Sequence, residues 1–246
     1  MPYRRDTLSF VQLVPNLVTI MGMCAGLSAI RYTFDGRFEL AAALIILAAI
    51  LDGIDGLLAR KLNAASSFGA ELDSFSDFVS FGVAPGILVF GYALTGPMAG
   101  FGWVFVLVFA VCACLRLARF NISRAVPDGA ATPHFVGVPA PAGAMLGLLP
   151  VYAGLAGLVD PSRFPVLTAF YLSVVGLLMV SRLPTPSLKG IRIKREYAIW
   201  VLVGMSVFVG FLFLRTWITL VVADLVYLSV LGTLALRHLR KEKGTS

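Results

Sequence analysis

Five of the thirteen acidic residues fall within one short stretch of an otherwise apolar chain, namely Asp52, Asp55, Glu71, Asp73 and Asp77. Ionisable side chains among apolar segments cost several kcal/mol unless they are paired, face water or bind a metal. Such a concentration of carboxylates therefore predicts a functional site.

Helical spacing places four of these carboxylates on two stripes. The first stripe comprises Asp52, Asp55, Gly56, Ala59 and Arg60, and the second comprises Gly69, Asp73 and Asp77. Two helices joined by a short loop pack as a hairpin, so the two stripes can face each other and bring the carboxylates together. Glu71 lies off the second stripe and is interpreted as a solvated side chain.

The chemistry of such a cluster is that of a hard divalent cation. Four close anions repel each other, and Arg60 is the single cation within the two stripes. Oxygen ligands with no His or Cys nearby favour Mg²⁺ or Mn²⁺ over Zn²⁺. Paired carboxylates can hold two such ions, an arrangement that clamps the oxygens of a transferring phosphoryl group. The sequence therefore predicts a two-metal site.

Other interpretations of the same residues stay open. The carboxylates could be helix caps and water-facing charges at a membrane boundary. They could also line an ion or proton pathway, because transporters carry buried acids. A pathway needs polar groups along its depth, whereas Asp224 is nearly the only acid in the other apolar segments. Gly56 and Gly69 could admit a ligand to the helix backbone or allow close helix packing.

The elements that must position this site are membrane-spanning helices. Of the 246 residues, 59% are hydrophobic, and the mean hydropathy is +0.90. Apolar stretches long enough to cross a bilayer recur along the whole chain, which leaves no separate soluble domain. We therefore expect an all-α polytopic membrane protein with a single domain over residues 1–246. About eight spans are predicted, at residues 13–32, 38–60, 69–94, 99–118, 138–158, 164–182, 197–214 and 217–236.

The distribution of basic residues predicts the orientation. With the N-terminus inside, only Arg31, Arg37, Arg163 and Arg215 fall on the outer side, and every other Lys and Arg falls on the inner side. The positive-inside rule then places both termini and the carboxylate cluster on the cytoplasmic side of the cell membrane. Basic loops such as residues 189–195, beside anionic lipid, account for the net charge of +7, so no nucleic-acid partner is expected.

The pattern D-x2-D-G-x2-A-R-x8-G-x3-D-x3-D runs from Asp52 to Asp77. Every fixed position matches the signature of the CDP-alcohol phosphotransferase family, so the chain resembles that family. The match covers the second and third predicted spans, and the other spans are compatible with the family's helical bundle. The resemblance implies transfer of a substituted phosphate from a CDP-linked donor to an alcohol, with release of CMP.

The resemblance also implies roles for individual residues. Asp52, Asp55 and Asp73 would bind the metal pair, and Asp77 would complete the metal site and act as the base. The CDP moiety would contact Gly56, Arg60, Ser66, Gly69, Asn16 and Thr19. The last two belong to the segment VPNLVT, in which Pro15 and Asn16 also fit the signal for a helix start.

Further segments resemble the integral-membrane members of the family whose donor is CDP-diacylglycerol and whose acceptor is L-serine. These segments are residues 77–86, 116–122 and 135–144. Neither His134 nor His238 lies in the H-x-K pattern that a covalent histidine route uses, which favours direct in-line attack by the serine hydroxyl.

A zwitterionic acceptor needs a cation for its carboxylate and a hydrogen-bond acceptor for its ammonium group. Arg116, Arg119 and Asn121, at the cytoplasmic end of the fourth predicted span, are the candidates. Positive-inside anchoring explains the two arginines equally well. Glycerol 3-phosphate, inositol phosphate, choline and ethanolamine stay open as acceptors, and so does the formation of a homodimer.

Overall fold

The computed structural model describes residues 10–62, 64, 66–97, 99–125, 135–181, 184–185 and 197–243. The predicted basic loop at residues 189–195 and the side chains of His134 and His238 lie outside the described part. The elements in chain order are α1 (Phe10–Phe34), α2 (Phe38–Lys61), α3 (Ser67–Asp77), the π-helical turn η1 (Phe78–Val83), α4 (Ala84–Ala93), α5 (Ala99–Ala125), β1 (Phe135–Val136), α6 (Ala140–Gly147), α7 (Leu149–Leu155), the 3₁₀ turn η2 (Pro161–Arg163), α8 (Pro165–Val180), β2 (Pro184–Thr185), α9 (Ala198–Leu214) and α10 (Thr216–Lys243).

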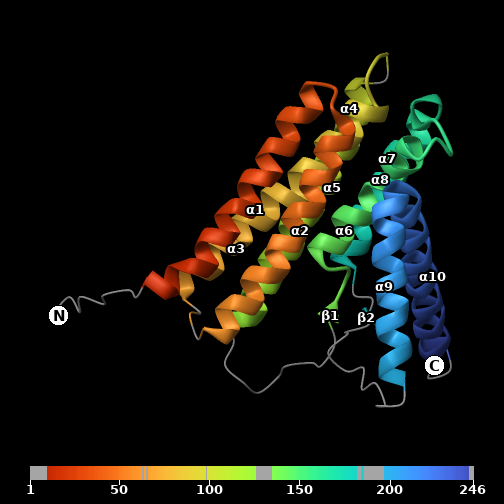
Figure 1. The fold of residues 1–246 in the computed structure, drawn as a ribbon. Coiled ribbons are helices and arrows are strands. Elements are labelled where there is room, and N and C mark those ends of the chain that lie inside the picture. Colours follow the sequence, from red (N-terminus) through yellow and green to blue (C-terminus); the bar gives the residue numbers. More distant parts are fainter. Residues whose placement is uncertain are drawn as a thin grey trace.

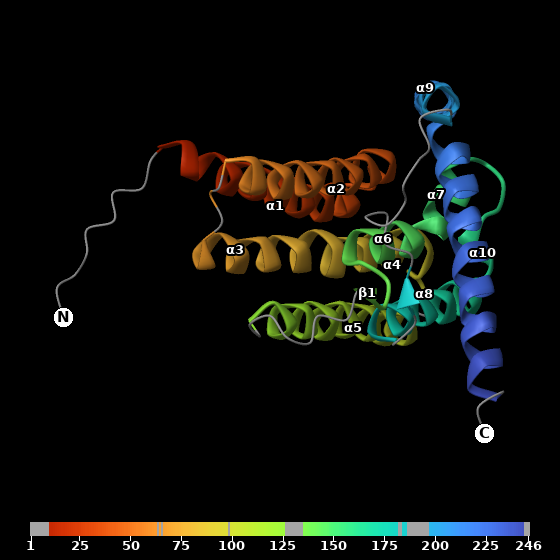
Figure 2. The same cartoon turned by 90° about the horizontal axis from the view of Figure 1, so that it is seen from below.

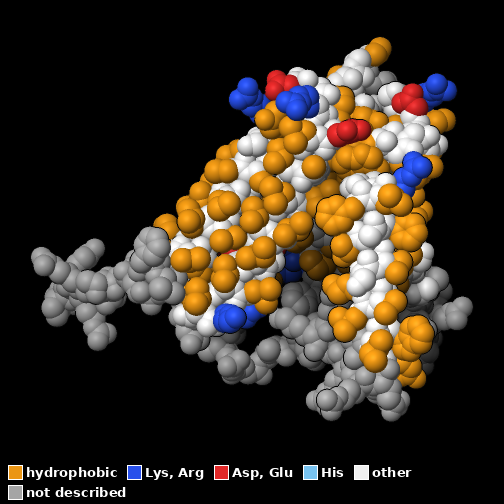
Figure 3. Space-filling view, in the orientation of Figure 1, with side chains coloured by type: hydrophobic (Ala, Val, Ile, Leu, Met, Phe, Trp, Pro, Cys, Tyr) orange, Lys and Arg blue, Asp and Glu red, His pale blue; other side chains and the backbone are white. Residues whose placement is uncertain are grey.

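The prediction of an all-α polytopic membrane protein is confirmed. Five helical stretches are long and apolar enough to cross a membrane, namely Leu13–Phe34, Phe38–Lys61, Ser67–Ala93, Ala99–Ile122 and Thr216–Ala235. Hydrophobic side chains cover the sides of the helices, and charged side chains gather toward their ends (Figure 3). This distribution matches a bundle whose flanks face lipid.

The other three predicted spans are shorter than expected. The structure has helices of 16 and 17 residues, α8 and α9, where residues 164–182 and 197–214 were predicted to span. Residues 138–158 form two short helices, α6 and α7, that meet at Leu148. Pro150 stands in the first turn of α7 and has no backbone N–H, so the bond that an unbroken helix would make from residue 150 to the Leu146 carbonyl is missing at this break.

Packing arranges the helices in layers (Figures 1 and 2). Helices α1 and α2 form one layer, α3 and α4 lie beneath them, and α5 with α8 lies beneath those. Helices α9 and α10 stand to one side, where α10 packs against α7. The apolar core between the layers includes Phe81, Phe109, Tyr152 and Leu172, each almost fully buried.

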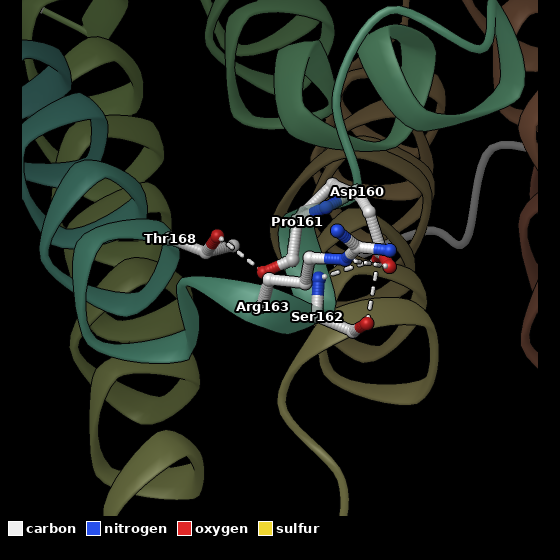
Figure 4. Close-up of polar contacts among 5 residues, drawn as sticks. All are labelled: Asp160, Pro161, Ser162, Arg163 and Thr168. Atoms are coloured by element: carbon white, nitrogen blue, oxygen red, sulfur yellow. Dashed lines mark hydrogen bonds and ion pairs between the residues drawn. The ribbon is translucent and has the colours of Figure 1, made fainter.

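A polar turn fixes the connection between α7 and α8 (Figure 4). The carboxylate of Asp160 accepts hydrogen bonds from the Ser162 hydroxyl at 2.6 Å and from Arg163 Nε at 3.2 Å. Thr168 Oγ1, in α8, donates to the Pro161 carbonyl at 3.4 Å. The hydrogen bonds from Ser162, followed by the Arg163 guanidinium, lower the pKa of Asp160 because they favour its charged form.

Helix α1 and the turn η1 approach each other at backbone distance. A Cβ atom at Gly26 would lie 2.8 Å from the Cα of Ser80. The Ser80 hydroxyl donates to the Gly22 carbonyl at 3.3 Å, one turn earlier in α1. Because η1 follows directly after Asp77, this contact positions the end of α3, where the second carboxylate stripe lies.

We expect Gly26→Ala to destabilise the protein, since the added methyl group would overlap backbone that cannot move independently. Overpacking of this kind costs about 1–3 kcal/mol. Gly22→Ala is the matched control, because a Cβ there would meet its nearest neighbours at 3.7 Å, an ordinary contact. Thermal unfolding in detergent should show a lower midpoint for Gly26→Ala alone. Equal midpoints for both variants would contradict the close approach.

Candidate active site

Three carboxylates from two helices converge at one point. Asp52 and Asp55 project from α2 and Asp73 from α3, and one oxygen from each lies within 4.8 Å of the others. Asp77, the last residue of α3, lies beside Asp52 and interacts with it electrostatically. The α2–α3 hairpin therefore brings together the four carboxylates that helical spacing placed on facing stripes.

A threonine from α1 holds one of these carboxylates. Thr19 Oγ1 donates to Asp55 Oδ2 at 2.6 Å and lies 3.1 Å from the Pro15 carbonyl. Both Thr19 and Asp55 are buried. The Gly56 backbone N–H also hydrogen-bonds the Asp55 carboxylate. A carboxylate oriented in this way has fewer conformations to lose when it binds a cation.

Thr19 therefore contacts the cluster through Asp55, and the contact with the donor that the resemblance implies stays a prediction. Pro15, which fits a helix-start signal, lies inside α1. The interpretation of Pro15 and Asn16 as a helix start is therefore wrong, because α1 begins at Phe10.

The start of α3 lies against α1. Ser66 caps the helix by accepting a hydrogen bond from the Gly69 backbone N–H at 3.0 Å. A Cβ atom at Gly69 would lie 2.8 Å from Asn16 Oδ1. Gly69 thus permits close approach of the Asn16 amide, which favours the packing explanation for this glycine.

Gly56 has different surroundings. A Cβ atom at Gly56 would meet no described atom within 4 Å. This glycine therefore borders open space beside Asp55, as expected where a ligand approaches the helix. Arg60 is exposed one turn further along α2.

The three residues predicted for the acceptor differ in their contacts. Arg116, on α5, acts electrostatically on Asp77 and Asp52, and its guanidinium lies 5.8 Å from the Phe120 ring centre. Arg119 is exposed and donates to the Val180 carbonyl at 3.1 Å, at the C-terminal end of α8. Of these three residues, Arg116 is thus the one that interacts electrostatically with the carboxylates.

Asn121 ties α5 to α3. Its amide nitrogen donates to the Ser74 hydroxyl at 3.0 Å, beside Asp73 in the sequence.

The serines that join α3 and η1 to α1 were missed in the sequence. Their helical spacing, from Ser76 to Ser80, was the one feature that could have indicated a shared helix contact. Ser76 donates to the Thr19 carbonyl at 3.2 Å, four residues before the corresponding contact of Ser80 with Gly22. The two serines thus join α3 and η1 to α1 through hydrogen bonds spaced one helical turn apart.

Comparison with known proteins identifies the family of this chain. The CDP-alcohol phosphatidyltransferase family matches residues 12–181, which include all the carboxylates of the cluster. The chain belongs to this family. Helices α9 and α10 follow the matched region.

Individual relatives extend the comparison. The chain is 37% identical over 226 residues to a CDP-diacylglycerol–serine O-phosphatidyltransferase of Mycobacterium leprae, covering 89% of this chain and 73% of the relative. It is 35% identical over 178 residues to the enzyme of that name in Bacillus subtilis, covering 72% of this chain and 91% of the relative. A relative of the same name in Methanocaldococcus jannaschii is 34% identical over 173 residues, covering 70% of this chain and 73% of the relative.

We expect Thr19→Val to weaken divalent-metal binding, because it keeps the volume but removes the hydroxyl that orients Asp55. Loss of such a supporting contact typically costs about 10- to 100-fold in metal affinity. Thr33→Val is the matched control, since Thr33 is also buried in α1 but donates only to the Ala29 carbonyl. Titration of Mn²⁺ followed by electron paramagnetic resonance measures both affinities. The same affinity in wild type and Thr19→Val would show that the contact does not organise a metal site.

Proposed function

We propose that this protein transfers the phosphatidyl group of CDP-diacylglycerol to L-serine, releasing CMP. The observation that carries the proposal is the convergence of Asp52, Asp55 and Asp73, with Asp77 beside them, in a chain of this family. The names of its relatives supply the two substrates. We also propose that the chain forms one domain in the cell membrane, with both termini and the site on the cytoplasmic side.

The four carboxylates would hold two Mg²⁺ or Mn²⁺ ions. The donor set supports hard cations, because every candidate ligand atom in the cluster is a carboxylate oxygen. When bound, the ions would supply Lewis-acid stabilisation of charge on the pyrophosphate oxygens. Thr19 and the Gly56 N–H would keep Asp55 oriented for this task.

The donor would approach along the α2 side of the cluster. Open space at Gly56 supports this direction, since it gives the CDP group access to the helix backbone. Arg60 is exposed nearby and would bind phosphate oxygens, while Ser66, Gly69, Asn16 and Thr19 complete the proposed donor region.

The reaction would be a single in-line displacement. The serine hydroxyl oxygen bonds to the phosphorus that carries diacylglycerol, and the bond from that phosphorus to the CMP oxygen breaks. Asp77 accepts the hydroxyl proton, and CMP leaves with the bonding electron pair. Arg116 lies within electrostatic reach of Asp77 and would bind the serine carboxylate, with Arg119 and Asn121 at the same end of α5.

The proposal is tested with purified protein, CDP-diacylglycerol, Mn²⁺ or Mg²⁺, and a panel of radiolabelled alcohols. We expect serine-dependent release of CMP that exhaustive chelation abolishes. Activity with glycerol 3-phosphate alone would make glycerol 3-phosphate the acceptor in place of serine. Full activity in protein shown by elemental analysis to be metal-free would refute the metal site.

Asp77→Asn should lower turnover by roughly 10²-fold or more, because asparagine keeps an oxygen and the side-chain volume but cannot accept the proton. Binding of CDP-diacylglycerol in the presence of metal should persist. Turnover and donor binding are measured on the same folded preparation. Normal turnover would refute the role as base, and loss of donor binding would make Asp77 chiefly a metal ligand.

Arg116→Ala should raise the KM for serine by about 10- to 100-fold, the scale of a lost charge-assisted hydrogen bond, with the KM for CDP-diacylglycerol little changed. Arg119→Ala is the comparison, because its guanidinium already binds the end of α8. We expect it mainly to lower the thermal unfolding midpoint. An equal rise in serine KM for both variants would place Arg119 in the acceptor pocket as well.

A further inference from the structure

Helix α10 carries a buried carboxylate that the proposed reaction does not use. The inward stripe of this helix comprises Trp217, Val221, Asp224, Tyr227 and Leu231, spaced by three or four residues. Asp224 is only 7% exposed, and its Oδ2 has no hydrogen-bond partner among the described residues. An acid at this depth in a helix that can span a membrane is expensive unless it binds something.

Two tyrosine hydroxyls lie within electrostatic reach of Asp224, and both give their protons to other groups. Tyr152 donates to the sulfur of Met145 at 3.4 Å, and Tyr171 donates to the Leu146 carbonyl at 2.8 Å. A hydroxyl that donates elsewhere presents only its lone pairs to remaining neighbours. The tyrosines can therefore act as acceptors toward whatever binds at Asp224.

The helix break between α6 and α7 contributes to this arrangement. In an unbroken helix the Leu146 carbonyl would accept from the N–H of Pro150, which proline lacks. Tyr171 takes that place, which holds its hydroxyl against the Leu146 carbonyl. Among the described residues, no basic side chain forms an ion pair with Asp224. Neither Tyr152 nor Tyr171 therefore offers its hydroxyl proton to the unpaired oxygen of Asp224.

We propose that Asp224, with the hydroxyl oxygens of Tyr152 and Tyr171, forms a subsite for a small monovalent cationic group between α7, α8 and α10. Carboxylate and hydroxyl oxygens suit both an alkali ion and a primary ammonium group. Either would satisfy the unpaired oxygen and neutralise the buried charge.

Tyr227 connects the subsite with the proposed acceptor pocket. Tyr227 follows Asp224 by one turn on the same face of α10, and Arg116 acts electrostatically on Tyr227. The cation could therefore be the ammonium group of the acceptor or an alkali ion from solution. Only binding of the acceptor's ammonium group rests on the proposed function.

The first experiment measures thermal unfolding of the full chain in detergent. NaCl, KCl or methylammonium chloride replaces N-methylglucamine chloride at constant ionic strength. Binding should raise the wild-type midpoint by roughly 3–6 °C at ten times the dissociation constant of one of the three small cations. Asp224→Asn should abolish the rise. Asp35→Asn, which removes an exposed acid on the α1–α2 turn, should keep it.

The second experiment distinguishes the two sources by serine kinetics. If the ammonium group of serine occupies the subsite, Asp224→Asn should raise the KM for serine about tenfold or more, with the KM for CDP-diacylglycerol unchanged. If an alkali ion occupies it, Na⁺ or K⁺ should stabilise the wild type and the serine KM should change little in the variant.

A wild-type midpoint that ignores all three small cations, together with an unchanged serine KM in Asp224→Asn, would overturn the subsite. Asp224→Asn keeps the side-chain volume and removes a buried charge, so it should fold. If it does not accumulate, Tyr171→Phe removes one oxygen of the subsite and should reduce the cation effect. If serine transfer is absent altogether, the first experiment still decides the subsite by itself.

Discussion

Mutual repulsion of four carboxylates is the constraint on which the rest of this structure depends. One oxygen each of Asp52, Asp55 and Asp73 lies within 4.8 Å of the others, with Asp77 beside Asp52, and Arg116 acts electrostatically on Asp77 and Asp52. Like charges at this separation in a bundle of apolar helices separate unless packing holds their backbones. The helices around the cluster supply that packing, and a bound divalent cation would neutralise the remaining repulsion between the carboxylates.

Helix α1 is the main support for the cluster. It contacts α2, α3, η1 and α4, and so reaches both sides of the carboxylate hairpin. Its residue Thr19 holds Asp55 directly, and its backbone carbonyls accept hydrogen bonds from Ser76 and Ser80. Small residues at Gly22 and Gly26 make these backbone contacts accessible. The π-helical turn after Asp77 lies in this contact, which agrees with the frequent placement of such turns at functional sites.

On the side of the cluster away from α1, the surrounding residues come from the later helices. These residues include charged side chains, whereas α1 contributes a hydroxyl and backbone carbonyls. Arg116 on α5 acts electrostatically on the carboxylates, while Arg119, three residues later, completes the end of α8. Two arginines on one helix thus have different neighbours, because they project in different directions from the helix axis. Arg116 interacts with the carboxylates and Arg119 with the end of α8. Helix α10 adds an inward stripe with two polar residues, Asp224 and Tyr227, beside these helices. An unpaired acid in that position is costly for stability, which is why it indicates binding rather than packing.

The sequence by itself determined the class of fold and the carboxylate hairpin, for two physical reasons. The length of an apolar stretch can be compared directly with the thickness of a bilayer. Helical periodicity puts residues three and four apart on one face. The facing of α2 and α3 follows from that local spacing, and the resemblance to the family rests on the residues of the same segment, from Asp52 to Asp77. All of these features depend on residues close together along the chain.

Only the tertiary structure decided how distant segments meet. Thr19 reaches Asp55 across 36 positions, Arg119 reaches Val180 across 61, and Asp224 lies near tyrosines from α7 and α8. The hydropathy that predicted one span at 138–158 could not predict that it would divide at Leu148, because apolar composition measures length and not the continuity of the hydrogen-bond ladder. Nor could spacing separate Gly56, which borders open space, from Gly69, which meets Asn16. Contacts between helices depend on rotation and depth in the bundle, and these are set by the packing of the whole chain.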